Sequence, residues 1–163
     1  MAGLSHQTQT GDRTRAGGGS QRGTVLLALT AMTVALIAAQ FALAGLGAFI
    51  MDKTPADNAY GPHVVLGVVI GVMTWLILAV VLVSRTARAD RRTLWLAVAL
   101  AVLALPVEPL LGEVSQHVPG LGALHALTGL AIFAQAGWLT RETSRRRAAA
   151  WRDGTARSAH SGD

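Results

Sequence analysis

Two histidines, His63 and His125, lie in apolar segments, and each is followed four residues later by a glycine, Gly67 or Gly129. An ionisable side chain in a membrane segment is costly, so each histidine marks a candidate functional site. One chemistry that uses two imidazoles at matched depth is axial ligation of a haem iron. The sequence therefore predicts a b-type haem (haem b) between His63 and His125, with Gly67 and Gly129 giving clearance for the flat ring.

The same residues allow other readings. Gly67 and Gly71 also form a small-residue spacing that is common in helix packing within membranes. The histidines could then be structural and hydrogen-bond between the helices of a scaffold or assembly subunit. A third hypothesis is a copper or zinc site on the outer face that uses His63, His117, His125 and a carboxylate, because imidazole suits both metals.

Two further polar residues are candidates for supporting this pair. Glu108 lies between Pro106 and Pro109, where it could accept the second N–H of a ligand imidazole and fix the orientation of that ring. It could equally reach the outer interface of the membrane. Gln40 lies deeper in its segment and could hydrogen-bond within the bundle. No residue is predicted to be catalytic, so whether the chain is an enzyme stays open.

The composition indicates what holds these residues. The chain has 163 residues, of which 52% are hydrophobic and 14% are charged, as is typical of membrane proteins. It has no cysteine, which excludes disulfides, thiolate metal sites, iron–sulfur clusters and covalently attached c-type haem. The formal net charge is +5, but the arginines flank apolar segments, so we expect no nucleic-acid partner.

The hydropathy pattern predicts an all-α membrane protein, whose four transmembrane helices form an antiparallel up-down bundle over residues 24–140. The predicted spans are about 24–51, 63–84, 93–112 and 121–140. The polar residues 1–23 and the basic residues 141–163 are predicted to be mostly disordered tails. The prolines at 106 and 109 are expected to kink the third span or end it early.

Arginine distribution predicts the orientation. The two tails and the loop between the second and third spans are rich in arginine, whereas loops 52–62 and 113–120 carry only Lys53. Positive segments stay on the cytoplasmic side, so both termini should be cytoplasmic in a multi-pass protein of the cell membrane. Both histidines would then lie toward the outer leaflet. The expected partners are the lipid bilayer and a membrane redox or assembly protein.

Two stretches carry a resemblance to known families. Residues 40–49 (QFALAGLGAF) and 124–133 (LHALTGLAIF) resemble a family of small four-helix bacterial membrane proteins, over about residues 24–140. That resemblance implies the fold and no particular activity. More distantly, histidines on the second and fourth spans resemble one four-helix half of haem A synthase, which implies haem-contacting roles for His63 and His125. The synthase family has a functional glutamate where this chain has Tyr60, so haem hydroxylation by this chain alone is not expected.

Overall fold

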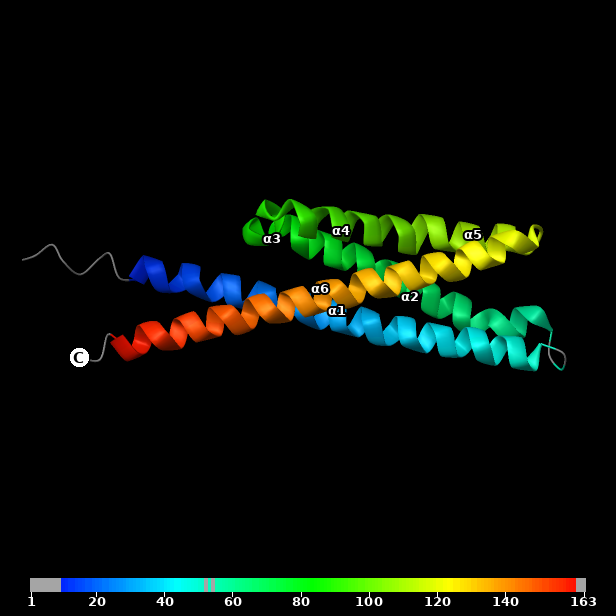
Figure 1. Cartoon of the computed structure of the whole chain (residues 1–163), viewed down its shortest axis with the longest axis horizontal. Helices are drawn as coiled ribbons and strands as arrows, with labels where there is room; N and C mark the ends of the chain where they lie inside the picture. Colours follow the sequence, from blue (N-terminus) through cyan, green and yellow to red (C-terminus); the bar gives the residue numbers. More distant parts are fainter. Residues whose placement is uncertain (1–9, 52, 54, 161–163) are drawn as a thin grey trace, which may run out of the picture.

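The computed structural model describes residues 10–51, 53 and 55–160, and every element within them is helical (Figure 1). The elements are α1 (Thr10–Ile50), α2 (Ala56–Val83), α3 (Arg85–Ala89), α4 (Arg91–Val102), the π-helical turn η1 (Leu103–Val107), α5 (Glu108–Ser115) and α6 (Pro119–His160). The prediction of an all-helical chain with four long apolar helices is confirmed for these residues.

The long helices alternate in direction. The N-terminal end of α1 and the C-terminal end of α6 lie at the same end of the bundle as α3, and both project beyond it (Figure 1). Helix α2 packs mainly against α1 and α4, whereas α6 packs mainly against α1 and α5. Helices α2 and α6, which carry the two histidines, are therefore diagonal to each other across the bundle.

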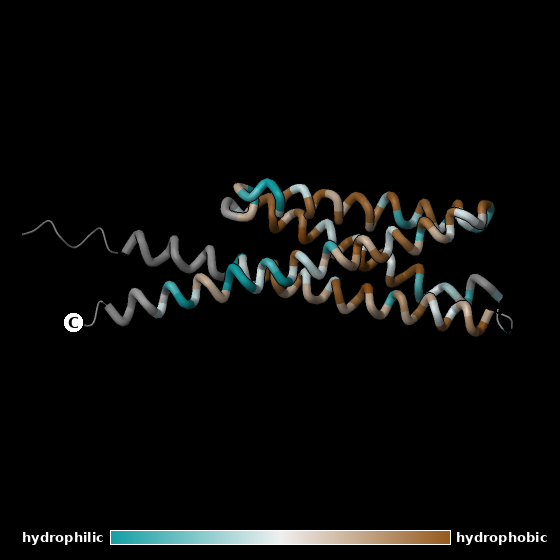
Figure 2. The backbone as a smooth tube through the Cα atoms, viewed as in Figure 1, coloured by the Kyte–Doolittle hydropathy of each residue, from teal (hydrophilic) through white to brown (hydrophobic). Residues whose placement is uncertain are grey.

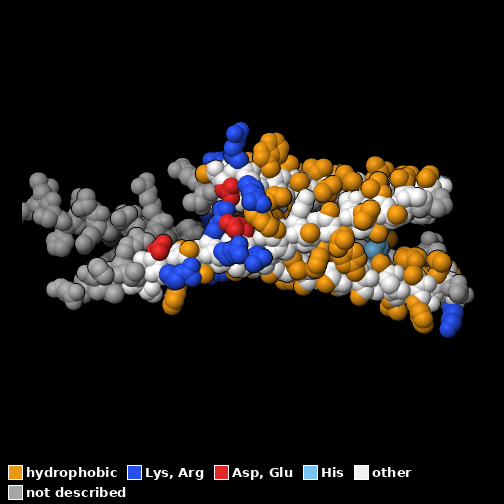
Figure 3. Space-filling model, in the orientation of Figure 1, with side chains coloured by type: hydrophobic (Ala, Val, Ile, Leu, Met, Phe, Trp, Pro, Cys, Tyr) orange, Lys and Arg blue, Asp and Glu red, His pale blue; other side chains and the backbone are white. Residues whose placement is uncertain are grey.

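The surface of the bundle is that of a membrane protein. Four helical segments are long and apolar enough to cross a membrane: Gln21–Ile50, Asn58–Val83, Arg91–Ser115 and Gly120–Asp153. Large apolar side chains such as Val65, Leu110 and Leu127 are more than 60% exposed on their outward faces. On the face shown in Figure 3, apolar side chains extend along the bundle and most Lys, Arg, Asp and Glu side chains gather near the end where the helices project (Figures 2 and 3). Exposing so large an apolar surface to water is energetically unfavourable, so this is an integral membrane protein.

The helices extend further than the sequence predicts. Residues 10–23 and 141–160, expected in disordered tails, are helical in α1 and α6. A helix already formed in the membrane can extend at little cost, because each added residue gains a hydrogen bond. The connections from α1 to α2 and from α5 to α6 are correspondingly shorter than predicted, since α2 begins at Ala56 and α5 continues to Ser115. The remaining residues of the predicted tails, 1–9 and 161–163, lie outside the described part of the chain.

The proline pair is accommodated within the third span. Pro106 lies inside η1, and Pro109 lies in the first turn of α5, where a missing N–H is tolerated. A π-helical turn is a local adjustment of the kind that lets a membrane helix pass a proline, so the span continues to Ser115 and is not ended early.

Small and hydroxyl-bearing residues allow the helices to pack closely. Ala97, Ala101 and Ala104 are almost completely buried along the third span. Thr33 and Thr74 are fully buried, and their hydroxyls donate to carbonyl oxygens of their own helices at 2.8 and 2.7 Å. Small residues let backbones approach, and hydroxyls satisfied within a helix add no polar cost to the interface.

Candidate functional site

His63 and His125 come together in the structure, and both residues are half-buried. Their ring centroids are 6.3 Å apart, and the ring planes are inclined at 70°. His63 lies seven residues after the first residue of α2, Ala56, and His125 lies six residues after the first residue of α6, Pro119. Both rings therefore lie about two turns into their helices, at closely matched depth, as the sequence pattern predicts.

Each imidazole is held by a backbone carbonyl of the preceding long helix in the chain. The Nδ1 atom of His63 lies 3.2 Å from the carbonyl oxygen of Gln40, and Nδ1 of His125 lies 3.2 Å from the carbonyl oxygen of Glu108. A carbonyl oxygen can only accept, so Nδ1 is the donor in each contact. In a neutral ring, the other nitrogen, Nε2, keeps its lone pair, which is the form in which a histidine ligates a metal.

The side chains of Gln40 and Glu108 lie next to the positions that Cβ atoms would take at Gly67 and Gly129. A Cβ atom added to Gly67 would lie 3.1 Å from Nε2 of Gln40, and one added to Gly129 would lie 3.0 Å from Oε1 of Glu108. Nε2 of Gln40 also donates to the carbonyl oxygen of His63 at 2.9 Å. The sequence predicts that these glycines make room for a flat ligand, whereas in the structure they make room for a polar side chain from the neighbouring helix.

The two supporting side chains retain unused acceptors. Oε1 of Glu108 lies 3.4 Å from Nδ1 of His125. Oε2 of Glu108 and Oε1 of Gln40 are buried, and neither has a hydrogen-bond partner among the described residues. A buried acceptor without a partner costs free energy, so both atoms are places where a water molecule or a bound group could donate a hydrogen bond.

Aromatic side chains flank the histidine pair. Tyr60 lies edge-on to His63 at 6.5 Å, and Phe41 lies edge-on to Phe133 at 6.2 Å. Phe41 also approaches the Cβ position of Gly129 at 3.6 Å. The sequence pattern does not place Phe41 at the site. Its position next to Gln40 is the available signal, but periodicity along one helix does not show which neighbouring helix a side chain meets.

His117 does not join this group. It is exposed in the short connection between α5 and α6. Within the described ranges, no three or more His, Asp or Glu side chains are grouped so that they could hold a metal ion. The geometry therefore gives no support to the alternative hypothesis of an outer-face copper or zinc site.

A second polar cluster joins the arginine-rich end of the bundle. The side chain of Asp90 begins α4 by accepting from the backbone N–H of Arg92 at 3.1 Å. It also accepts from the hydroxyl of Thr93 at 2.6 Å and from the guanidinium of Arg146 on α6. These donors, Thr93 first and Arg146 second, lower the pKa of Asp90 to about 2. The pair connects the start of α4 to the extended part of α6.

Comparison with known proteins adds no assignment, because no family model, curated protein or solved structure matches this chain.

Proposed function

We propose that this membrane protein binds b-type haem between α2 and α6, with His63 and His125 as the axial ligands. The observation that carries the proposal is the matched anchoring of the two rings, each through Nδ1 on a backbone carbonyl, which leaves both Nε2 atoms available. Its role would be electron transfer or haem handling near the outer leaflet, with a membrane redox or assembly protein as partner.

The separation of the rings fits two ligands on opposite sides of one metal ion. Imidazole nitrogens bind transition metals at about 2 Å. Two imidazoles that hold one metal ion between them would therefore have ring centroids about 6 Å apart. The observed 6.3 Å agrees with this arrangement. The side chains of Gln40 and Glu108, which lie over Gly67 and Gly129, would have to move aside to admit the ring of a haem.

The residues around the pair would set the properties of the group. When bound, haem would supply a one-electron redox centre, tuned by ligand identity, burial and hydrogen bonding. The Gln40 and Glu108 carbonyls would fix the ring orientations. The Glu108 carboxyl group, 3.4 Å from Nδ1 of His125, would add a hydrogen-bond acceptor on one side only.

A structural role for the histidines is the second candidate. The same Nδ1 hydrogen bonds join α2 to α1 and α6 to α5, so the rings also connect neighbouring helices. In that case the protein is a membrane scaffold or assembly subunit, and replacement of both histidines by glutamine should leave folding and partner capture unchanged.

We infer that the protein lies in the cell membrane with both termini in the cytoplasm. The N-terminal end of α1, the C-terminal end of α6 and α3 lie at one end of the bundle (Figure 1). Among the described residues, Lys and Arg gather there, and Lys53 is the only one at the opposite end (Figure 3). The positive-inside rule then gives the orientation.

The absorption spectrum of detergent-purified protein from haem-replete cells tests the haem proposal. We expect a Soret band that is lost in both His63→Ala and His125→Ala. His117→Ala is the matched control, because this histidine is exposed outside the site, and it should retain the band. Colourless wild-type protein with normal helical content would overturn the proposal, as would stoichiometric copper or zinc without haem.

A further inference from the structure

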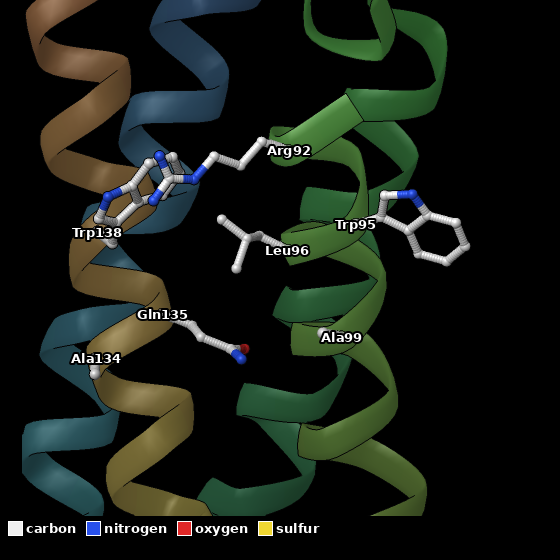
Figure 4. Close-up of a pocket in the computed structure, with 7 residues that line it drawn as sticks. All are labelled: Arg92, Trp95, Leu96, Ala99, Ala134, Gln135 and Trp138. Carbon is white, nitrogen blue, oxygen red and sulfur yellow. The ribbon is translucent and has the colours of Figure 1, made fainter. Parts of the chain in front are cut away.

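A groove of about 600 Å³ lies between α4 and α6 (Figure 4), and neither histidine of the pair lines it. Its lining residues are Arg92, Trp95, Leu96, Ala99, Ala134, Gln135 and Trp138. The side chain of Leu96 points into the space between the helices, and Ala99 and Ala134 leave it wide (Figure 4). These three residues give the groove an apolar lining with room between the two helices.

The guanidinium group of Arg92 lies at one end of the groove. The guanidinium carbon of Arg92 lies 4.5 Å from the centroid of the Trp138 ring, which fixes the charge at this depth. Within the part of the chain that the structure describes, the guanidinium of Arg92 has no ion pair, because the neighbouring acid, Asp90, pairs with Arg146. The groove thus offers an uncompensated positive charge beside an apolar channel.

A polar side chain lies deeper in the groove. Gln135 is one turn from Trp138 on α6, and its amide points across toward α4 (Figure 4). Its Oε1 atom is buried without a hydrogen-bond partner among the described residues. An amide can offer either an acceptor or two donors by rotating, so it suits the hydroxyl and ester groups of a lipid headgroup region. An unsatisfied amide in an otherwise apolar groove is a cost that such a ligand would remove.

We propose that this groove binds an anionic phospholipid. Its phosphate pairs with Arg92, its glycerol region hydrogen-bonds to Gln135, and one acyl chain lies along Leu96, Ala99 and Ala134. Charge complementarity favours a lipid over a partner helix, because an apolar helix would bury Arg92 without an anion. Basic pockets between transmembrane helices are established sites for anionic headgroups.

Native mass spectrometry of the full chain, purified in detergent, tests the proposal with phosphatidylglycerol and phosphatidylcholine as probes. We expect phosphatidylglycerol to bind at least fivefold more tightly, since one arginine at the membrane surface contributes about 1 kcal/mol. Arg92→Gln should lose most of that preference. Arg145→Gln, an exposed arginine of α6 outside the groove, is the matched control and should keep it.

Two further variants separate the groove from general surface charge. Ala99→Leu fills the groove without changing any charge, and Gln135→Leu removes the amide; both should weaken phosphatidylglycerol binding several-fold. Thermal unfolding by circular dichroism verifies that each variant is folded. Equal binding of the two lipids would overturn the proposal, as would equal loss in Arg92→Gln and Arg145→Gln, or unchanged binding in folded Ala99→Leu.

Discussion

Replacing Gly47 by alanine should destabilise the protein and displace Tyr60. Gly47 is buried where α1 meets α2. A Cβ atom there would lie 2.8 and 2.9 Å from Cδ1 and Cε1 of the Tyr60 ring, and 3.0 Å from the carbonyl oxygen of Ala59. Ordinary contact begins at 3.4 Å, and one of the clashing atoms is backbone, so relief requires α2 to move.

A second glycine of the same helix allows the magnitude to be isolated. Gly45 is exposed, and a Cβ atom there meets nothing within 4 Å. Both substitutions gain up to about 1 kcal/mol of helix propensity, and only Gly47→Ala adds an overpacking cost of about 1–3 kcal/mol. The propensity gain cancels in the comparison, so the two variants should differ in unfolding free energy by about 1–3 kcal/mol.

The assay is reversible unfolding in mixed micelles, with the sodium dodecyl sulfate fraction as denaturant and circular dichroism as the signal. Gly45→Ala should be equal to or more stable than the wild type, and Gly47→Ala less stable than Gly45→Ala. Because Tyr60 lies edge-on to His63, Gly47→Ala should also alter tyrosine fluorescence. Equal stability of the two variants would refute the packing of Tyr60 against α1.

Two other predictions concern the ends of the bundle. The pKa of Asp90, about 2, is below its ordinary value of 3.8, so its stabilisation is complete above pH 4 and is lost as the pH falls toward 2. Asp90→Asn should lower the free energy of unfolding by about 1 kcal/mol at neutral pH, a figure discounted because Arg146 is half exposed. The melting temperature of this variant should depend less on pH between pH 4 and 2 than that of the wild type. An equal fall in melting temperature in both proteins would contradict this. Alkaline phosphatase, active only outside the cytoplasm, should be active when inserted after Lys53 and inactive when fused to the C-terminus; the reverse pattern would contradict the proposed orientation.

The helical architecture follows directly from the hydropathy pattern. Each of the four predicted spans overlaps a helix of the structure, because apolar segments of about 20 residues have few alternatives in lipid. Helix ends were less predictable. Residues 10–23 and 141–160 have no apolar stripe to indicate a helix, and their helical state depends on continuity with a membrane span.

The candidate site was predictable only along each helix. The spacing from His63 to Gly67 and from His125 to Gly129 gives a shared face, and arginine distribution gives a shared end. Neither pattern shows which residue of a neighbouring helix faces the glycine, because that depends on the rotation and register of two helices. The occupation of both clearances by polar side chains therefore emerges only from the structure.

The same dependence on register explains why the two halves of the site look alike but differ chemically. In each half, the backbone carbonyl of a polar residue accepts a hydrogen bond from Nδ1 of the histidine. The side chain of the same polar residue lies over the glycine four residues after that histidine. The sequence separations are different, 23 residues from Gln40 to His63 and 17 from Glu108 to His125, so simple alignment of the halves hides the equivalence. Once the halves are matched in space, they differ by an amide at Gln40 and a carboxyl group at Glu108. A ligand held by the two Nε2 atoms would therefore have a neutral amide beside one imidazole and an ionisable group beside the other, and this asymmetry traces to Glu108.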